Sequence, residues 1–290
     1  MQRTLPNPTV EIETRAWRLR FLDAPPPRDA VPEDGEVLVV HEPRKVYVLT
    51  EPVDATAPSS RFDDAGGRSL SLLWMPPLAF EGADAAWLES IPVEGPKDGR
   101  RVVRAGLRTA RVLWTNARVI IYATPEQFPD ALDAVIRFTV LERDTSEIEQ
   151  AMPEIWGSIT RNAKLTHTVW PGDLRRNGEA VGKMTEHVTR LNTRALHNDG
   201  ALEQLDPALT PGSKRLFAEL TLQADLHDRL EALAEPLDFA FDYHEVLNTR
   251  IIEASQWSKS NRVEVWILIV LGMELIATVY PMVEGMLPLN

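Results

Sequence analysis

The side chains that most often carry out chemistry are sparse in this sequence and do not form a recognisable group. Cysteine is absent, which excludes disulfides, iron–sulfur clusters, thiolate zinc sites and cysteine nucleophiles. The six histidines form neither an HExxH motif nor a close metal-binding triad. Acidic residues flank His227 and His244, but sequence neighbours in a helix point to different sides. The sequence therefore predicts no catalytic residue, no metal ligand and no cofactor.

One segment superficially resembles a phosphate-binding loop. Residues 178–185 read GEAVGKMT, with one residue too few between the glycines and Met184 before Thr185. A lysine and a hydroxyl at this spacing would not meet phosphate and magnesium as that motif requires. The formal net charge of −12 also argues against nucleic acid as the main partner. We therefore interpret the segment as a chance match and expect no nucleic-acid binding.

An apolar segment near the C-terminus gives the clearest indication of where in the cell the protein lies. Residues 263–283 read VEVWILIVLGMELIATVYPMV, and at 1.5 Å per residue they span roughly 31 Å, about the thickness of a bilayer core. Basic residues precede the segment and none follows it, which is the positive-inside pattern. We predict a tail-anchored protein with one transmembrane helix over 263–283 and a short tail over 284–290. Its N-terminal domain would lie in the cytoplasm of a bacterium, at the inner membrane, or on the matrix side of an organelle.

Two glutamates complicate this interpretation. Glu274 divides the segment into apolar stretches of nine residues, a length more typical of a buried helix in a soluble protein. An acid inside a bilayer is costly unless it is protonated, hydrogen-bonded or facing a partner. Glu264, Glu274 and Thr278 are therefore candidates for contact with another helix at the membrane. The alternative is that Glu274 lies near the lipid boundary and reaches out to water.

The elements that precede this segment indicate an α+β domain. Short apolar runs separated by proline and glycine predict strands, and from Pro125 the apolar spacing changes to the three and four of an amphipathic helix. We expect an α+β soluble domain over 1–197 and a linker over 198–212, which is rich in proline and glycine. The predicted strands are 10–21, 36–40, 45–49, 70–74, 101–115 and 118–123, with further helices at 147–159 and 182–196.

A 3.5-residue apolar repeat runs through the helical part at 213–262. Its spacing predicts a coiled-coil-like stalk that joins copies of the chain, or else a helix that packs on its own domain. Pro236 should kink or divide this helix, because proline removes a backbone donor. His244, at one repeat position, is a candidate pH-sensitive residue. The residues that we assign to the seam are Leu226, Leu230, Leu233, Leu237, Leu247 and Ile251.

The C-terminal part resembles the required-for-meiotic-nuclear-division family, of which the chain would be a distant member. The resemblance rests on Arg229, Leu233, Leu237 and Asp238 and on VEVWILIVLGMEL at 263–275. The segments RVIIYATPEQFPDALDAVIRF at 118–138 and LDPALTPGSKRLFAEL at 205–220 are similar to further parts of that family. The resemblance implies a domain of unknown function, a helical region and one C-terminal span. It implies assembly-related, oligomeric roles and no enzymatic activity.

Two functions follow as expectations. The first is a membrane-anchored, non-enzymatic scaffold or assembly factor that self-associates through its stalk and span, with the lipid bilayer, second copies of itself and an unknown protein as partners. The alternative is a membrane-tethered enzyme of unfamiliar type with its site in the N-terminal α+β domain. A pocket that gathers acids or histidines with perturbed pKa values favours the enzyme, and a closed, well-filled domain favours the scaffold.

Overall fold

The structure is a computed structural model that describes residues 14–53, 68–77, 102–107, 110–166 and 171–284. Within these ranges the side chains of 28, 171–175, 255, 258–263 and 277–284 lie outside the description. The chain divides into two compact units, and each unit is built from two separate segments. Unit 1 comprises Met1–Gln150 and Thr193–Ala234, and unit 2 comprises Ala151–Asn192 and Glu235–Asn290.

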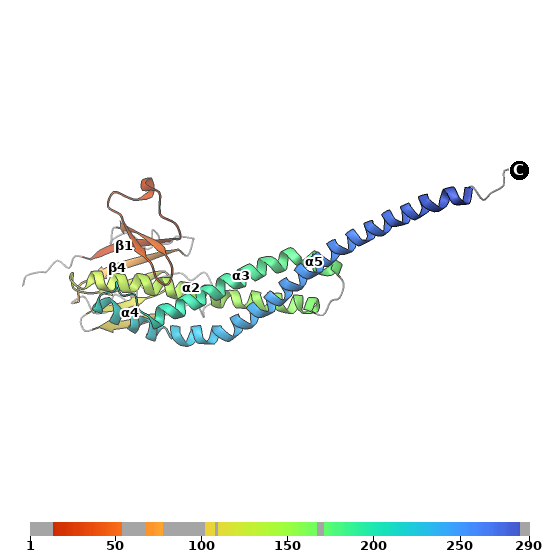
Figure 1. Ribbon diagram of the computed structural model, residues 1–290. Helices are drawn as coiled ribbons and strands as arrows, with labels where there is room; N and C mark the ends of the chain where they lie inside the picture. The colour runs from red at the N-terminus through yellow and green to blue at the C-terminus, as the bar shows by residue number, and fades with distance from the viewer. Residues whose placement is uncertain (1–13, 54–67, 78–101, 108–109, 167–170, 285–290) are drawn as a thin grey trace, which may run out of the picture. The chain divides into compact units, whose positions relative to one another are not determined.

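Unit 1 is organised around a seven-stranded mixed sheet (Figure 1). The strand order is β2-β3-β1-β4-β7-β6-β5, and neighbours run antiparallel except for the parallel pair β4 and β7. Most of the predicted strands are present with similar bounds, although the predicted run at 101–115 forms two strands. The strands are β1 (Arg15–Leu22), β2 (Glu36–Val40), β3 (Val46–Val53), β4 (Ser69–Met75), β5 (Val103–Leu107), β6 (Ala110–Trp114) and β7 (Arg118–Tyr122).

Strand β7 shows why the sheet is buried on both faces. Its sequence RVIIY is rich in β-branched residues, and every residue in it is buried. Alternate side chains point to opposite faces of a strand. Val119 and Ile121 accordingly join the large core cluster, whereas Ile120 and Tyr122 join a smaller cluster on the other face with Leu73. The parallel register places Leu72 beside Val119 and Trp74 beside Ile121.

The helices are longer than the sequence pattern indicated. The two helices expected after Pro125 are one continuous helix, and the third extends well beyond 182–196 in both directions. Pro153 lies inside the first of these helices on its exposed side. The α-helices are α2 (Phe128–Asn162), α3 (Pro171–Glu203), α4 (Pro211–Gln223) and α5 (Leu226–Glu284), and short 3-10 helices occupy Arg28–Ala30 and Ala163–Thr166.

Helices α2 and α4 cover one face of the sheet (Figure 1). The Trp114 ring meets Phe138 of α2 edge-on, with ring centroids 4.9 Å apart. Its indole nitrogen donates to the Thr139 hydroxyl at 2.9 Å, so the buried polar atom is satisfied. Helix α4 begins at a capped end, because the Thr210 hydroxyl accepts from the Ser213 backbone N–H. The sheet and these helices partly fit the predicted α+β class, whereas the stalk and the transmembrane helix of the predicted fold are not seen in the described residues.

The predicted separate stalk over 213–262 is wrong. Helix α4 and the first residue of α5 belong to the sheet core, where Phe217, Leu220 and Leu226 share one apolar cluster with strand residues. Helix α5 also runs without interruption through Pro236, so the helix is not divided there. Loss of one backbone donor is tolerated because Leu233 and Leu237 on either side are buried.

Unit 2 is helical in its described part. It contains the second part of α2, the first part of α3 and most of α5. Its apolar centre gathers Leu165, Val181, Leu247 and Ile251. The centre is small compared with the sheet core of unit 1. We therefore expect surface substitutions to lower the stability of unit 2 more than that of unit 1.

The prediction of a transmembrane helix over 263–283 is also wrong, and with it the tail-anchored, single-pass location. In the described ranges, no helix combines the length and the apolar character that crossing a bilayer requires. The physical reason lies in the two acids. The apolar run between Glu264 and Glu274 spans nine residues, or about 14 Å at the rise of an α-helix, about half of a bilayer core.

Candidate association segment and arginine-held acidic segment

The seam residues of α5 are buried within a single copy of the chain. Leu226 packs in the sheet core of unit 1, and Leu247 and Ile251 pack against Leu165 and Val181 in unit 2. The remaining seam positions, Leu230, Leu233 and Leu237, are buried as well. A seam that its own chain already covers is not available to a second copy. The 3.5-residue repeat therefore marks a buried stripe of α5.

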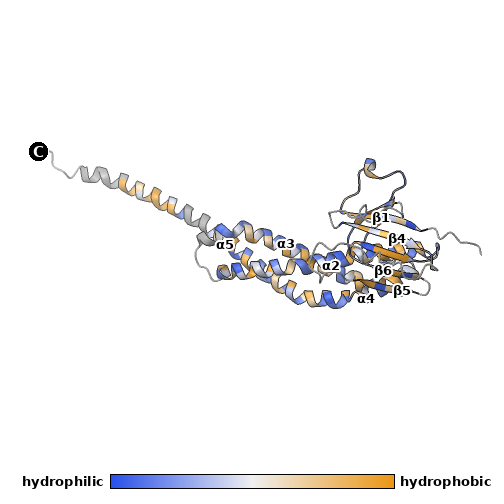
Figure 2. Ribbon diagram, turned by 180° about the vertical axis from the view of Figure 1, so that it is seen from behind, coloured by the Kyte–Doolittle hydropathy of each residue, from blue (hydrophilic) through white to orange (hydrophobic). Residues whose placement is uncertain are grey.

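The apolar residues of α5 beyond Glu264 are exposed instead. Ten large apolar side chains between Val265 and Ile276 are each at least 46% accessible, and Figure 2 shows the hydrophobic colouring of this stretch. We call residues 264–276 the association segment. Glu264 and Glu274 are exposed within it, whereas the side chain of Thr278 lies outside the described residues. The ten are Val265, Trp266, Ile267, Leu268, Ile269, Val270, Leu271, Met273, Leu275 and Ile276.

A second feature lies in α2, where residues 142–149 read ERDTSEIE. We call these residues the acidic segment. Its four acids form two pairs at helical spacing, Glu142 with Glu149 and Asp144 with Glu147. The structure brings arginines from three other parts of unit 1 to these four acids.

Arg229 of α5 holds two acids of this segment at once. Its Nη1 donates to Glu142 Oε2 at 2.6 Å. Its Nε and Nη2 donate to the two carboxylate oxygens of Glu149, both at 2.7 Å, which is the bidentate geometry that gives the strongest arginine–carboxylate bonds. Ser146 accepts a longer bond of 3.3 Å from Nη2. Arg229 therefore fastens the start of α5 to α2 within unit 1.

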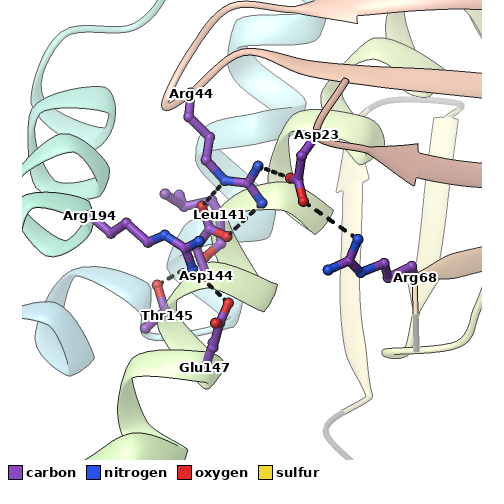
Figure 3. Close-up of polar contacts among 8 residues, drawn as sticks. All are labelled: Asp23, Arg44, Arg68, Leu141, Asp144, Thr145, Glu147 and Arg194. Carbon is purple, nitrogen blue, oxygen red and sulfur yellow. Dashed lines mark hydrogen bonds and ion pairs between the residues drawn. The ribbon is translucent and has the colours of Figure 1, made fainter. Parts of the chain in front are cut away.

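Arg44, between β2 and β3, holds Asp144 in the same bidentate way (Figure 3). Its Nε and Nη2 lie 2.8 and 3.1 Å from the two Asp144 oxygens, and its Nη1 donates to Asp23 at 2.7 Å. Asp23 also faces Arg68 at 3.5 Å. Figure 3 places Glu147 one turn further along α2, where it accepts a 2.7 Å bond from Arg194 of α3. These pairs connect the sheet, α2 and α3.

Burial and pairing set the charge state of the arginines in this region. Burial lowers the pKa of Arg44 and Arg229, but hydrogen bonds and the charges of their acid partners outweigh burial and raise both pKa values above the ordinary value. Arg143 has no such acid, so burial lowers its pKa to about 10. Its Nη2 donates to the carbonyls of Ser69 and Asn116, and its guanidinium carbon lies 4.7 Å from the Phe21 ring centroid.

In this arrangement the arginines connect α2 to other elements of unit 1. Each acid of the segment is engaged by a cation, so it is not free to act as a base or a nucleophile. No three metal-ligating side chains are grouped in the residues that the structure describes. A cavity of about 310 Å³ lies at the start of α5, where Asp225, His227 and Asp228 are among its lining residues. These three side chains are exposed, so the cavity does not hold them in the desolvated surroundings that acid–base catalysis usually requires.

The described contacts define a class: an α+β sheet domain whose helices are tied together by arginine–carboxylate pairs and whose last helix exposes an apolar segment. No family model and no curated protein matches the chain. Among solved structures, the chain is similar to the structure of the full-length CmaX protein, with 14% identity, a TM-score of 0.39 and 83% of each chain covered. A likeness at this level supports no inference about activity. The resemblance to the required-for-meiotic-nuclear-division family stays a prediction.

Proposed function

We propose that the protein is a non-enzymatic scaffold or assembly factor that self-associates through the association segment of α5. The observation that supports this proposal is the exposure of ten large apolar side chains along twelve consecutive residues. A helix that is apolar on all sides is normally buried, and contiguous exposed apolar surface of this kind marks an interaction site.

Second copies of the same segment are the occupant that best fits its shape. A flat partner would cover one side of the helix, whereas each helix in a bundle of several identical helices is covered by more than one neighbour. At about 25 cal/mol per Å², a side chain whose burial contributes 1.5–3 kcal/mol corresponds to roughly 60–120 Å². Ten such side chains, about half to two-thirds exposed, offer roughly 300–800 Å² per copy, up to the level of a standard interface at about 800 Å² per partner.

The ion-paired domain gives such an assembly a rigid body to position. Arg44, Arg194 and Arg229 fix α2 to the sheet and to the other helices of unit 1 through partly buried charge pairs. At Arg44 and Arg229 the pairing holds one geometry, because a broken contact would leave the buried carboxylate of Asp144 or Glu142 without its partner. The proposed function therefore combines a sheet domain of fixed internal geometry with a helix segment that binds other copies of the chain.

Leu268→Lys tests the proposal, with Leu196→Lys as a matched control. The two leucines are almost equally exposed, at 67% and 65%, but only Leu268 lies in the association segment. We expect the full chain to form a discrete oligomer by sedimentation velocity and light scattering. Leu268→Lys should shift it toward the single-chain mass of 32.6 kDa, and Leu196→Lys should leave it unchanged. A wild-type chain of single-chain mass would refute the proposal, as would equal masses for both variants.

A further inference from the structure

Unit 2 carries a row of stacked aromatic rings that the proposed function does not use. Trp156 of α2 stacks on Phe239 of α5 with centroids 5.7 Å apart and planes at 23°, and Phe239 stacks on Tyr243 at 6.4 Å and 24°. The Tyr243 hydroxyl donates to the Ile159 carbonyl at 3.2 Å, which fixes that end of the row. Trp156 and Phe239 remain 42% and 51% exposed. Trp156 is at the end of the row, so its contact with Phe239 uses one face of the Trp156 ring.

The surroundings of this row are acidic. Residues 235–245 contain four acids and neither lysine nor arginine. Glu235 and Asp242 stand four residues before and three residues after Phe239, which places them on the same side of the helix as its ring. Both acids are exposed, and none of the ion pairs among the described residues engages them. They differ in this respect from the acids of the acidic segment.

We propose that this aromatic and acidic face, formed by Trp156, Phe239, Tyr243, Glu235 and Asp242, binds an arginine-containing segment of a partner protein. A guanidinium can stack flat on an exposed ring while its N–H groups donate to a carboxylate beside the ring. An ammonium group lacks the flat surface and the fork of donors, so arginine should bind better than lysine.

Charge distinguishes this partner from the other candidates. A second copy of the chain would bring its own net charge of −12 to an acidic face. Nucleic acid would bring phosphates, which the same acids repel. A basic segment is complementary to both the rings and the carboxylates. This inference does not depend on the association segment, which lies elsewhere on α5.

Fluorescence anisotropy with labelled peptides provides the test. The probe is a peptide of alternating arginine and glycine, compared with lysine–glycine and aspartate–glycine peptides of equal length. We expect the arginine peptide to bind more tightly than the lysine peptide and the aspartate peptide not to bind. Phe239→Leu and Trp156→Leu, which keep an apolar side chain but remove the ring, should each weaken arginine-peptide binding by about 2- to 30-fold. Two separate ring variants, each checked by circular dichroism, guard against a folding defect in either one.

The contribution of Glu235 and Asp242 to peptide binding is tested separately, with a matched control. The double variant Glu235→Gln/Asp242→Asn should weaken binding and reduce its dependence on salt. Neutralising two exposed acids of α3 by Glu179→Gln/Glu186→Gln should change binding much less. Equal binding of arginine and lysine peptides, or unchanged binding in both ring variants, would overturn the proposal. A drop in oligomer mass caused by the ring variants would overturn it as well, because the face would then join copies of the chain.

Discussion

Removal of Arg229 should destabilise the protein more than any surface ion pair can. We consider Arg229→Met, which keeps an unbranched side chain and removes the charge. Glu142 is the partner that decides the size of the effect, because its side chain is only 3% exposed. Glu149 is 37% exposed and can be solvated after the change. Loss of one partner of a buried pair costs about 3–5 kcal/mol. Since Arg229 itself is 16% exposed, we expect about 2–4 kcal/mol of lost unfolding free energy.

Urea unfolding followed by circular dichroism and tryptophan fluorescence measures this loss. Lys183→Met is the matched control, because Lys183 forms a 2.7 Å pair with Glu179 in which the two side chains are 75% and 82% exposed. An exposed pair of this kind contributes about 0–1 kcal/mol. The double variant Arg229→Met/Glu142→Gln should recover part of the loss, because it removes the unpaired buried charge. Equal stability of Arg229→Met and Lys183→Met, or no recovery in the double variant, would refute the reasoning.

Two further predictions concern single titratable residues of α5. His244 is fully buried with both ring nitrogens lacking a hydrogen-bond partner in the described structure, and burial lowers its pKa below 6.5. As the pH falls, the unfolded chain therefore binds the proton before the folded chain does. The contribution of His244 to the unfolding free energy is complete above about pH 6.5, and the unfolding free energy falls below that pH by at most about 1.4 kcal/mol per pH unit. His244→Phe should remove this part of the pH dependence in unfolding titrations, and an unchanged pH dependence would contradict the prediction. Glu274→Gln should strengthen self-association measured by sedimentation, because the Glu274 carboxylates of different copies no longer meet in the apolar contact. Weaker association than in the wild type would show that the charge is favourable there.

The sequence predicted local elements well where one periodicity dominated. The β-branched run of β7 indicated a buried strand, and the structure buries all five of its residues. The 3.5-residue repeat of α5 indicated a buried stripe, and its leucines are buried. Both patterns depend on the alternation of side chains along one element, which the sequence alone contains.

The sequence also overestimated one element. The segment at 263–283 looked long enough to cross a bilayer, yet the described structure contains no helix with the required length and apolar character. Glu264 and Glu274 matter more than the total length of the segment, because they bound an apolar run of only nine residues. The acids of ERDTSEIE in α2 were not identified as a site, because their arginine partners lie far away in the sequence.

Tertiary structure decided which chain segments meet. Arg44, Arg194 and Arg229 are separated from their acid partners by 100, 47 and 80 to 87 positions, and periodicity contains no information on pairing at such distances. Whether a buried stripe is covered by its own chain or by a second copy depends likewise on how the helices fold back. Composition and spacing therefore indicated where strands and apolar helix faces occur, but not how far the helices extend. Only the fold could bring the arginines to the acids of α2 and the rings of Trp156 and Phe239 together, because each contact requires two elements to be placed in space.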